Sequence, residues 1–201
     1  MTTRNTLTSL VGILTIIAIV AFGATLARAL FISDDTEVPV PDKTPTSDIV
    51  SPYDLPDTLR IPSLEITAAV QHVGVTANGT MANPTNFTDV GWYKFGPAPG
   101  KRGSAVMAGH VDNGLALDGV FKHLGDLKKG DDIYVVNAGG KRLHFVVEDV
   151  VSYPYKDVPL ETLFKRADKA RLNLVTCEGN WVKKEKTYDQ RLVVYTTLAS
   201  D

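Results

Sequence analysis

Three residue types that together support acyl transfer stand far apart in this 201-residue chain. Cys177, the only cysteine, follows the apolar run "RLNLVT", and His110 follows the apolar run "GSAVMAG". Arg191 opens the β-branched run "RLVVYTT". A thiolate can attack a carbonyl carbon, an imidazole can move protons, and a guanidinium can hold an oxyanion. If these runs are neighbouring strands, the three side chains meet at one end of a sheet.

Each of the three residues also has an ordinary structural interpretation. A lone cysteine in a strand is commonly a small buried apolar residue, and His110 would be a plain loop histidine. Arg191 would form an ion pair at a sheet edge, for instance with Glu178 or Asp189. What favours chemistry at Cys177 is its expected place where a strand ends beside polar residues, because a thiol there is both reachable and rigidly held.

The patterns that must position these groups are mostly those of short strands. The runs 131–137 and 142–153 surround two glycines and predict a β-hairpin. Residues 170–177 and 190–199 are strong strand patterns on either side of a segment, 178–189, that we interpret as a polar loop. If the latter two strands pair side by side, the thiol and the guanidinium emerge near the same loop.

The remaining patterns fix the fold class. Pro62 interrupts the apolar run 59–70, as in an edge strand or a bulged strand. Short helices are expected within 120–127 and 159–167. Six to eight short strands with one or two short helices indicate a mainly β protein with an antiparallel or mixed barrel.

The N-terminus predicts a membrane anchor. From Thr6 to Ala27 there are 22 residues without a charge, and as a helix they would extend about 33 Å, the thickness of one hydrocarbon core. A cleaved signal peptide has a shorter apolar core, although the sequence Ala-Arg-Ala at 27–29 is also readable as a cleavage site. We therefore interpret residues 1–32 as a cytoplasmic tip followed by a transmembrane signal anchor.

Residues 33–58 are interpreted as an extracytoplasmic linker. They hold five of the eleven prolines and seven acidic residues against one lysine, a composition typical of an extended, semi-rigid spacer. Its second half packing across the domain as a lid is an alternative that the sequence leaves open. Residues 59–201 then form a catalytic domain outside the cytoplasm.

Composition excludes several other classes of protein. The net charge of −2 gives no basic surplus for a nucleic-acid partner. One cysteine cannot form a disulfide within the chain, and without a Cys-x-x-Cys pair or a histidine–cysteine cluster we predict neither a metal site nor a cofactor. A thiol outside the cytoplasm is open to oxidation, so its presence there favours a chemical role.

Three motifs, in order, resemble those of the sortases, the membrane-anchored cysteine transpeptidases of Gram-positive and related bacteria. They are "AGHVD" around His110, "LNLVTCEG" around Cys177 and "YDQRLVVYTT" around Arg191. The resemblance covers residues 59–198. Within the family the sequence "GHVD" is most similar to class F, with classes D and E close behind.

The resemblance implies an eight-stranded β-barrel in which Cys177, His110 and Arg191 are the catalytic set. Asp112 would orient His110 or simply form the turn after it, and Thr176 would donate a hydrogen bond to substrate or only favour the strand. Trp181 would gate the site. An apolar groove for the substrate would be lined by Val106, Ala108 and Leu174.

The implied function is cleavage of an LPxTG-like sorting signal on surface proteins through a thioester on the cysteine. The acyl group would pass to an amine, either of a lipid-linked peptidoglycan precursor or of a pilin lysine, or to water. Two alternatives stand beside it: another wall-active cysteine hydrolase or transpeptidase, and a non-catalytic β-barrel binding module tethered to the membrane.

Overall fold

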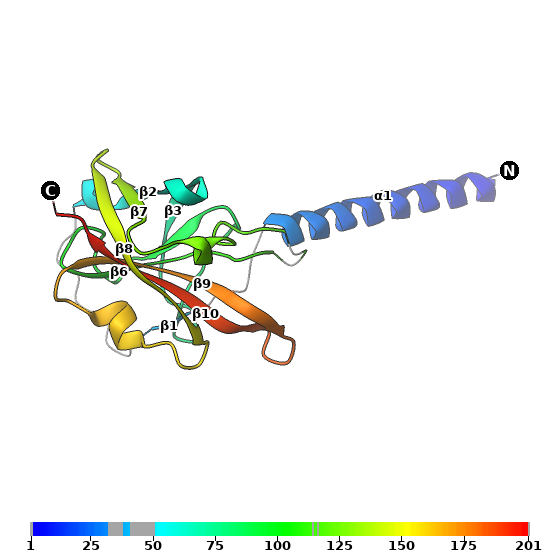
Figure 1. Ribbon diagram of the computed structural model, residues 1–201. Coiled ribbons are helices and arrows are strands. Elements are labelled where there is room, and N and C mark those ends of the chain that lie inside the picture. Colours follow the sequence, from blue (N-terminus) through cyan, green and yellow to red (C-terminus); the bar gives the residue numbers. More distant parts are fainter. Residues whose placement is uncertain (1, 32–37, 41–50, 114, 116, 201) are drawn as a thin grey trace.

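The computed structural model describes residues 2–31, 38–40, 51–113, 115 and 117–200 (Figure 1). The N-terminal segment forms one helix, α1 (Thr2–Phe31). Of the helices in the described part of the chain, none combines the length and the apolar character that crossing a membrane requires.

Eight strands close into a barrel in the order β10-β8-β7-β2-β3-β5-β6-β9, as the mainly β interpretation predicts. Neighbours are antiparallel except for two parallel pairs, β3 with β5 and β6 with β9. The barrel strands are β2 (Pro56–Ile61), β3 (Ile66–Val73), β5 (Val90–Tyr93), β6 (Gly103–Ala108), β7 (Asp132–Asn137), β8 (Arg142–Pro154), β9 (Ala170–Val182) and β10 (Thr187–Leu198).

The short helical turns and one small sheet complete the fold. The predicted helix at 120–127 is a single turn, η3 (Leu124–Asp126), and the one at 159–167 is a short π-type turn, η4 (Glu161–Lys165). The other elements are η1 (Pro52–Asp54), η2 (Pro62–Leu64) and a two-stranded sheet of β1 (Val38–Pro39) and β4 (Thr80–Met81). The hairpin expected between 131 and 153 is confirmed as β7 and β8.

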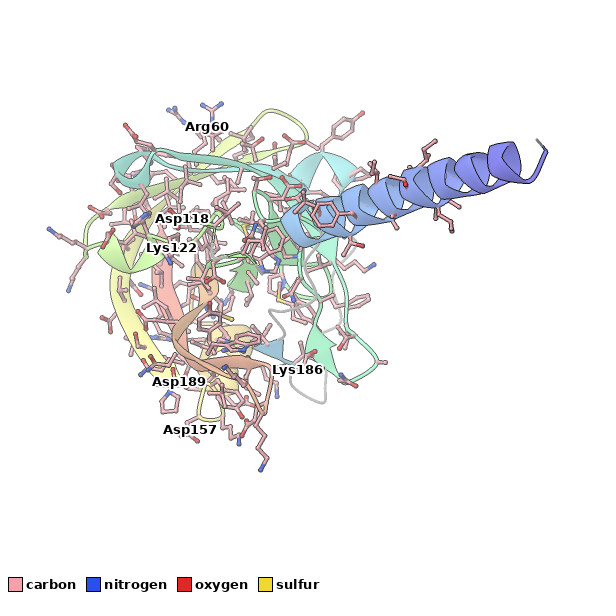
Figure 2. The ribbon with its side chains drawn as sticks, turned by 90° about the vertical axis from the view of Figure 1, so that its right-hand side faces the viewer. Arg60, Asp118, Lys122, Asp157, Lys186 and Asp189 are labelled. Atoms are coloured by element: carbon pink, nitrogen blue, oxygen red, sulfur yellow. The ribbon has the colours of Figure 1, made fainter. Side chains whose placement is uncertain are left out.

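Apolar side chains gather on both faces of the sheet. The inner cluster takes residues from the barrel strands, among them Leu59, Ile133 and Leu174, and fills the barrel. The outer cluster packs one face of β5, β6, β9 and β10 against η4 and against Val38 and Met81 of the small sheet. Charged residues such as Arg60, Asp118 and Lys122 are exposed (Figure 2). Alternate residues of the central strands β6 and β9 are therefore buried on opposite faces, which explains their continuous apolar pattern.

The structure differs from the sequence interpretation at Pro62. The run 59–70 is two antiparallel strands, β2 and β3, joined by the turn η2. Proline has no N–H to donate to a strand neighbour, and its fixed φ suits the first position of a turn. Glu65 completes the reversal in a left-handed conformation, with φ 56°.

The folded domain also begins earlier than the expected boundary at residue 59. Strand β2 starts at Pro56, and Val38 is fully buried in the outer cluster. The segment 38–40 therefore packs on the domain. Residues 41–50, which belong to the segment expected to be a linker or a lid, lie outside the described residues.

The expected polar loop 178–189 is wrong, because β9 and β10 continue through most of it as a long hairpin. Val182 pairs with Thr187 and Trp181 with Tyr188, so only residues 183–186 form the turn. Polar residues are compatible with the strands here because most side chains in this part of the hairpin are exposed. Cys177 accordingly lies inside a strand rather than at its end.

Candidate active site

The ladder between β9 and β10 makes Cys177 and Arg191 direct cross-strand partners. Both side chains are buried, with 2% and 4% of their surface exposed. Directly opposed residues on neighbouring strands point to the same face of the sheet. The thiol and the guanidinium are therefore fixed side by side by backbone pairing.

The parallel ladder between β6 and β9 brings His110 to the same level. Ala108 pairs with Val175, and the backbone N–H of Gly109 donates to the carbonyl of Val175 at 3.1 Å, which extends the ladder beyond the end of β6. His110 and Cys177 each follow the Ala108–Val175 pair by two residues, so the same register, continued beyond the end of β6, places His110 beside Cys177. The three predicted residues form one row across the end of β6, β9 and β10.

This row lies on the outer face of the barrel wall. Cys177 is two residues from Val175 and Arg191 is two from Val193, and both valines belong to the outer cluster. Because side chains two apart in a strand share a face, the row continues the apolar surface of that cluster. The sequence predicted that the three groups meet at one end of the barrel. In the structure they instead lie on the outer face of its wall.

His110 is held by a loop that precedes β5. Its Nε2 lies 3.2 Å from the carbonyl oxygen of Pro84, and its ring centroid lies 5.0 Å from that of Phe87. Burial lowers the pKa of His110 below its usual value, while the Pro84 carbonyl and the nearby Asp112 carboxylate raise it in part. Burial dominates, so the neutral imidazole is favoured near pH 7.

The guanidinium of Arg191 is held by backbone carbonyls. Nη1 donates to the carbonyls of Tyr188 and Gln190 at 3.1 and 3.0 Å, and Nη2 donates to the Thr187 hydroxyl at 2.8 Å. The guanidinium carbon lies 5.8 Å from the ring centroid of Tyr155. These contacts with described residues use three of the five N–H donors of the guanidinium.

The two carboxylates proposed as ion-pair partners of Arg191 have other contacts. The Glu178 carboxylate accepts a hydrogen bond from the Ser152 hydroxyl. The Asp189 carboxylate accepts from the backbone N–H of Asn180 at 2.7 Å. Arg191 is therefore held by two backbone carbonyls and a hydroxyl rather than by the ion pair expected at the sheet edge.

Thr176 and Asp112 have partners that define what they can do. The Thr176 hydroxyl, 1% exposed, donates to the carbonyl of Gly109 at 2.8 Å and so ties β9 to the residue before His110. Asp112 accepts a hydrogen bond from the Tyr188 hydroxyl, and its backbone forms a bridge with Asp118. Thr176 thus fixes the end of β6, and Asp112 belongs to both the turn and the surroundings of His110.

The predicted groove residues fall on different faces. Val106 and Ala108 belong to the outer cluster, on the face that carries Cys177, and are buried there. Leu174 instead lies in the inner cluster. It precedes Cys177 by three positions in the strand, and an odd difference places two side chains on opposite faces. Trp181 is 42% exposed, and its ring lies 5.4 Å from that of Tyr188 in an edge-to-face contact.

A β-bulge explains the glycine that follows Cys177 and Glu178. The register between β9 and β10 shifts between Tyr188 and Gln190, and Gly179 has a φ of 85°. A Cβ at this position would lie 2.1 Å from Oδ1 of Asp189. Only glycine combines this conformation with so close a carboxylate, so the bulge beside Cys177 depends on it.

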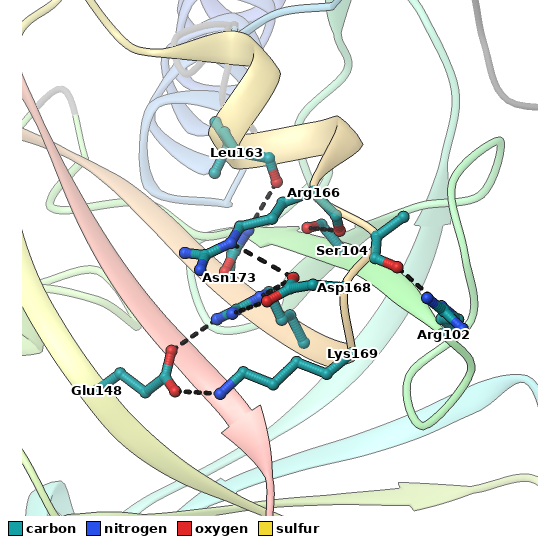
Figure 3. Close-up of polar contacts among 10 residues, drawn as sticks. Arg102, Ser104, Glu148, Leu163, Arg166, Asp168, Lys169 and Asn173 are labelled. Carbon is teal, nitrogen blue, oxygen red and sulfur yellow. Dashed lines mark hydrogen bonds and ion pairs between the residues drawn. The ribbon is translucent and has the colours of Figure 1, made fainter.

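A charged network holds the other end of β9 (Figure 3). Arg171, 2% exposed, donates to Glu148 on β8 at 2.6 Å and to both oxygens of Asp168 at 3.0 and 2.8 Å. The hydrogen bonds from Arg171 hold the pKa of Asp168 well below its usual range. The network fixes the chain between η4 and β9, and thereby the strand that carries the thiol.

The sequence match decides the family. A model of the sortase domain matches residues 59–199. The chain belongs to the sortase family. This is a family of cysteine transpeptidases, so the chain is an enzyme of that class.

Solved sortases share the fold. Sortase C from Clostridium perfringens SM101 is 19% identical over 76% of this chain and 73% of that one, with a TM-score of 0.54. Sortase C-1 from Actinomyces oris is 24% identical over 76% and 77%, with a TM-score of 0.54. Sortase A from Corynebacterium diphtheriae, a lid mutant, is 22% identical over 73% and 71%, with a TM-score of 0.56. A search of curated proteins found no match.

Sequence reasoning missed two sets of residues at this candidate site. Pro84 and Phe87 precede His110 by more than 20 positions and carry no chemical signature. Thr187 and Tyr188, which hold Arg191, lie in the stretch interpreted as a loop. Trp181, Val182 and Tyr188 are of residue types enriched in strands, and this signal would have extended both predicted strands to include Thr187 and Tyr188. Among the described residues, no group of three histidine, cysteine or acidic side chains could hold a metal ion.

Proposed function

We propose that Cys177 is the nucleophile of this sortase, His110 its proton-transfer group and Arg191 the residue that holds the oxyanion. The observation that supports this assignment is the row formed by the end of β6 with β9 and β10. Backbone pairing holds a nucleophile, a proton carrier and a fixed cation at one level, which is the arrangement that acyl transfer needs.

In the first half-reaction the Cys177 thiolate attacks the scissile carbonyl carbon, and a C–S bond forms. The negative charge moves to the carbonyl oxygen, where the guanidinium of Arg191 stabilises it. The C–N bond then breaks, and the imidazolium of His110 gives its proton to the leaving amine. The products are a thioester and a free amine.

In the second half-reaction an incoming amine attacks the thioester carbonyl. His110 accepts the amine proton, the C–S bond breaks, and the thiolate returns. Because burial lowers the pKa of His110, the imidazolium needed in the first half-reaction is a minority species near pH 7. We therefore expect only part of the enzyme to be in the reactive protonation state at one time.

The substrate we propose is a surface protein with an LPxTG-like C-terminal signal. The acceptor is the amine of a lipid-linked peptidoglycan precursor or of a pilin lysine, and water in their absence. Trp181, exposed four residues beyond Cys177, is positioned to contact bound peptide. Val106 and Ala108 support the apolar floor beside Cys177. On the sequence "GHVD" we propose that the chain belongs to class F or to one of the neighbouring classes D and E.

We also propose that residues 6–27 anchor the catalytic domain on the outer side of a cell membrane. This proposal rests on the uncharged sequence of that segment alone. No helix of the described residues has the length and apolar character of a membrane span. It is tested by fractionating cells that express the full chain and a chain lacking residues 2–31. The proposal requires the first in the membrane fraction and the second outside it.

The experiment that tests the proposed reaction is a peptide-library cleavage screen with the full chain. We expect cleavage of LPxTG-like peptides between threonine and glycine by the wild type, and no cleavage by Cys177→Ala or His110→Asn. His123→Asn is the matched control for the histidine, because His123 is exposed on the turn η3. Cleavage by Cys177→Ala at the wild-type rate would refute the assignment.

A further inference from the structure

Tyr188 contacts both partners of the thiol through two different groups. Its backbone carbonyl accepts a hydrogen bond from Nη1 of Arg191 at 3.1 Å, and its hydroxyl donates to the carboxylate of Asp112, two residues beyond His110. The ring packs edge to face against Trp181 at 5.4 Å. One residue of β10 is thus joined to the guanidinium and to the loop that carries the imidazole.

We propose that Tyr188 is a positioning residue for acyl transfer: its hydroxyl holds the Asp112 carboxylate beside His110, while its carbonyl holds Arg191. The inference rests on the proposed function, because it assigns the residue that keeps the proton carrier and the oxyanion-holding group in one arrangement.

The backbone connections around His110 show why its loop needs such a contact. His110 itself is fixed by Pro84 and Phe87, and Thr176 fixes Gly109 before it. Beyond His110 the chain leaves the sheet and turns back at Asp118. The Tyr188–Asp112 hydrogen bond is a side-chain connection that ties this outgoing segment to the β9–β10 hairpin.

The Tyr188–Asp112 hydrogen bond acts on the pKa of His110 through the charge of Asp112. The Asp112 carboxylate raises the pKa of His110 against the dominant effect of burial. A carboxylate that is held in place exerts a constant field, whereas a released one turns toward solvent, where its charge is screened. Loss of the Tyr188 hydroxyl is therefore expected to lower the pKa of His110. The other charged and titratable groups on the elements around His110 are Cys177, Tyr188, Arg191, Asp89, Asp118 and Lys122.

The substitution Tyr188→Phe isolates the hydroxyl. It keeps the backbone carbonyl that binds Arg191 and the ring that packs on Trp181. The matched control is Tyr53→Phe, since Tyr53 is 72% exposed in the turn η1. We expect kcat of the full chain with Tyr188→Phe to fall about tenfold with little change in KM, and Tyr53→Phe to leave both unchanged.

The decisive readout is the pH titration of the His110 ring by NMR in the full chain carrying Cys177→Ala. We expect the midpoint to move to lower pH in Tyr188→Phe and in Asp112→Asn, and the double variant to move no further than Asp112→Asn alone. Additive shifts, or a midpoint in Tyr188→Phe equal to that of Tyr53→Phe, would overturn the proposal. Since this titration needs no turnover, it is independent of the cleavage test that decides the proposed function.

Discussion

Cys177 and Arg191 are paired residues of one antiparallel ladder. Their relative position is set by the backbone hydrogen bonds of β9 and β10. The pair therefore stays in place as long as the hairpin keeps its register. The same register is what brings the hydroxyl and carbonyl of Tyr188 to the site.

Replacing Arg191 with lysine tests whether catalysis needs a guanidinium that is held by backbone carbonyls. An ammonium group is a single point charge, and it cannot bind two carbonyls and a hydroxyl while also presenting donors to an oxyanion. We expect Arg191→Lys to lower kcat for peptide cleavage by about 10²-fold, with a smaller change in KM. Arg142→Lys, at the exposed start of β8, is the control in the same steady-state assay. Equal rates for the two variants would contradict the role of Arg191.

The Thr176 hydroxyl is expected to matter through Gly109. In Thr176→Val the buried carbonyl of Gly109 loses this donor, and we expect the free energy of unfolding to fall by about 1–2 kcal/mol, together with a loss of activity. Thr67→Val, on the exposed face of β3, should change neither quantity. Urea unfolding of the full chains measures the difference. If both valine variants unfold alike, the hydroxyl does not support the site.

Gly179 and Gly140 form a matched pair that separates backbone strain from contact. Both have positive φ, 85° and 81°. A Cβ at Gly140 meets nothing within 4 Å, whereas one at Gly179 meets the Asp189 carboxylate. Alanine at either position carries the strain of a left-handed residue, about 1 kcal/mol.

Only Gly179→Ala is expected to cost more than this and to abolish cleavage, because it must displace Asp189 and with it the register of the bulge beside Cys177. Urea midpoints and cleavage rates of the two variants make the comparison. Full activity in Gly179→Ala would show that the bulge does not position the thiol.

The Arg171 network predicts a loss of stability in acid. Hydrogen bonds from Arg171 lower the pKa of Asp168 in the folded protein. Burial raises the pKa of Glu148, but the hydrogen bonds from Lys169 and Arg171 together outweigh it and lower that pKa. As pH falls below the ordinary carboxyl range, near 4, the unfolded chain takes up protons that the folded protein resists, so stability decreases.

We expect the urea midpoint of the wild type to fall from pH 6 to pH 3, and Asp168→Asn to reduce that slope. Asp157→Asn, at an exposed position after β8, should keep the wild-type slope. If the slope of Asp168→Asn matches that of the wild type, the Asp168 carboxylate does not contribute to the loss of stability in acid.

How much of the site was predictable depended on whether a residue has a chemical signature. Cys177, His110 and Arg191 could be found because thiol, imidazole and guanidinium stand next to strong strand patterns. The face on which they lie could not be found, since β6 and β9 are apolar on both faces and their period-two pattern is hidden. Leu174 was assigned to the groove for the same reason.

The hairpin beyond Cys177 was missed for a different reason. Half of the residues 178–189 are charged and most are exposed. This polarity suggests a loop, although the two strands need only pair with each other to form. The bulge at Gly179 further breaks the alternation. Pro84 and Phe87, which hold His110, are common residue types at a distance that only the fold brings close.

The most direct test of the central claim is mass spectrometry of the full chain trapped during turnover with an LPxTG-like peptide. The account predicts an adduct equal to the N-terminal fragment of the peptide, located on Cys177 and released by hydroxylamine as expected for a thioester. Cleavage that proceeds with no adduct on Cys177, or with the adduct on another residue, would contradict it.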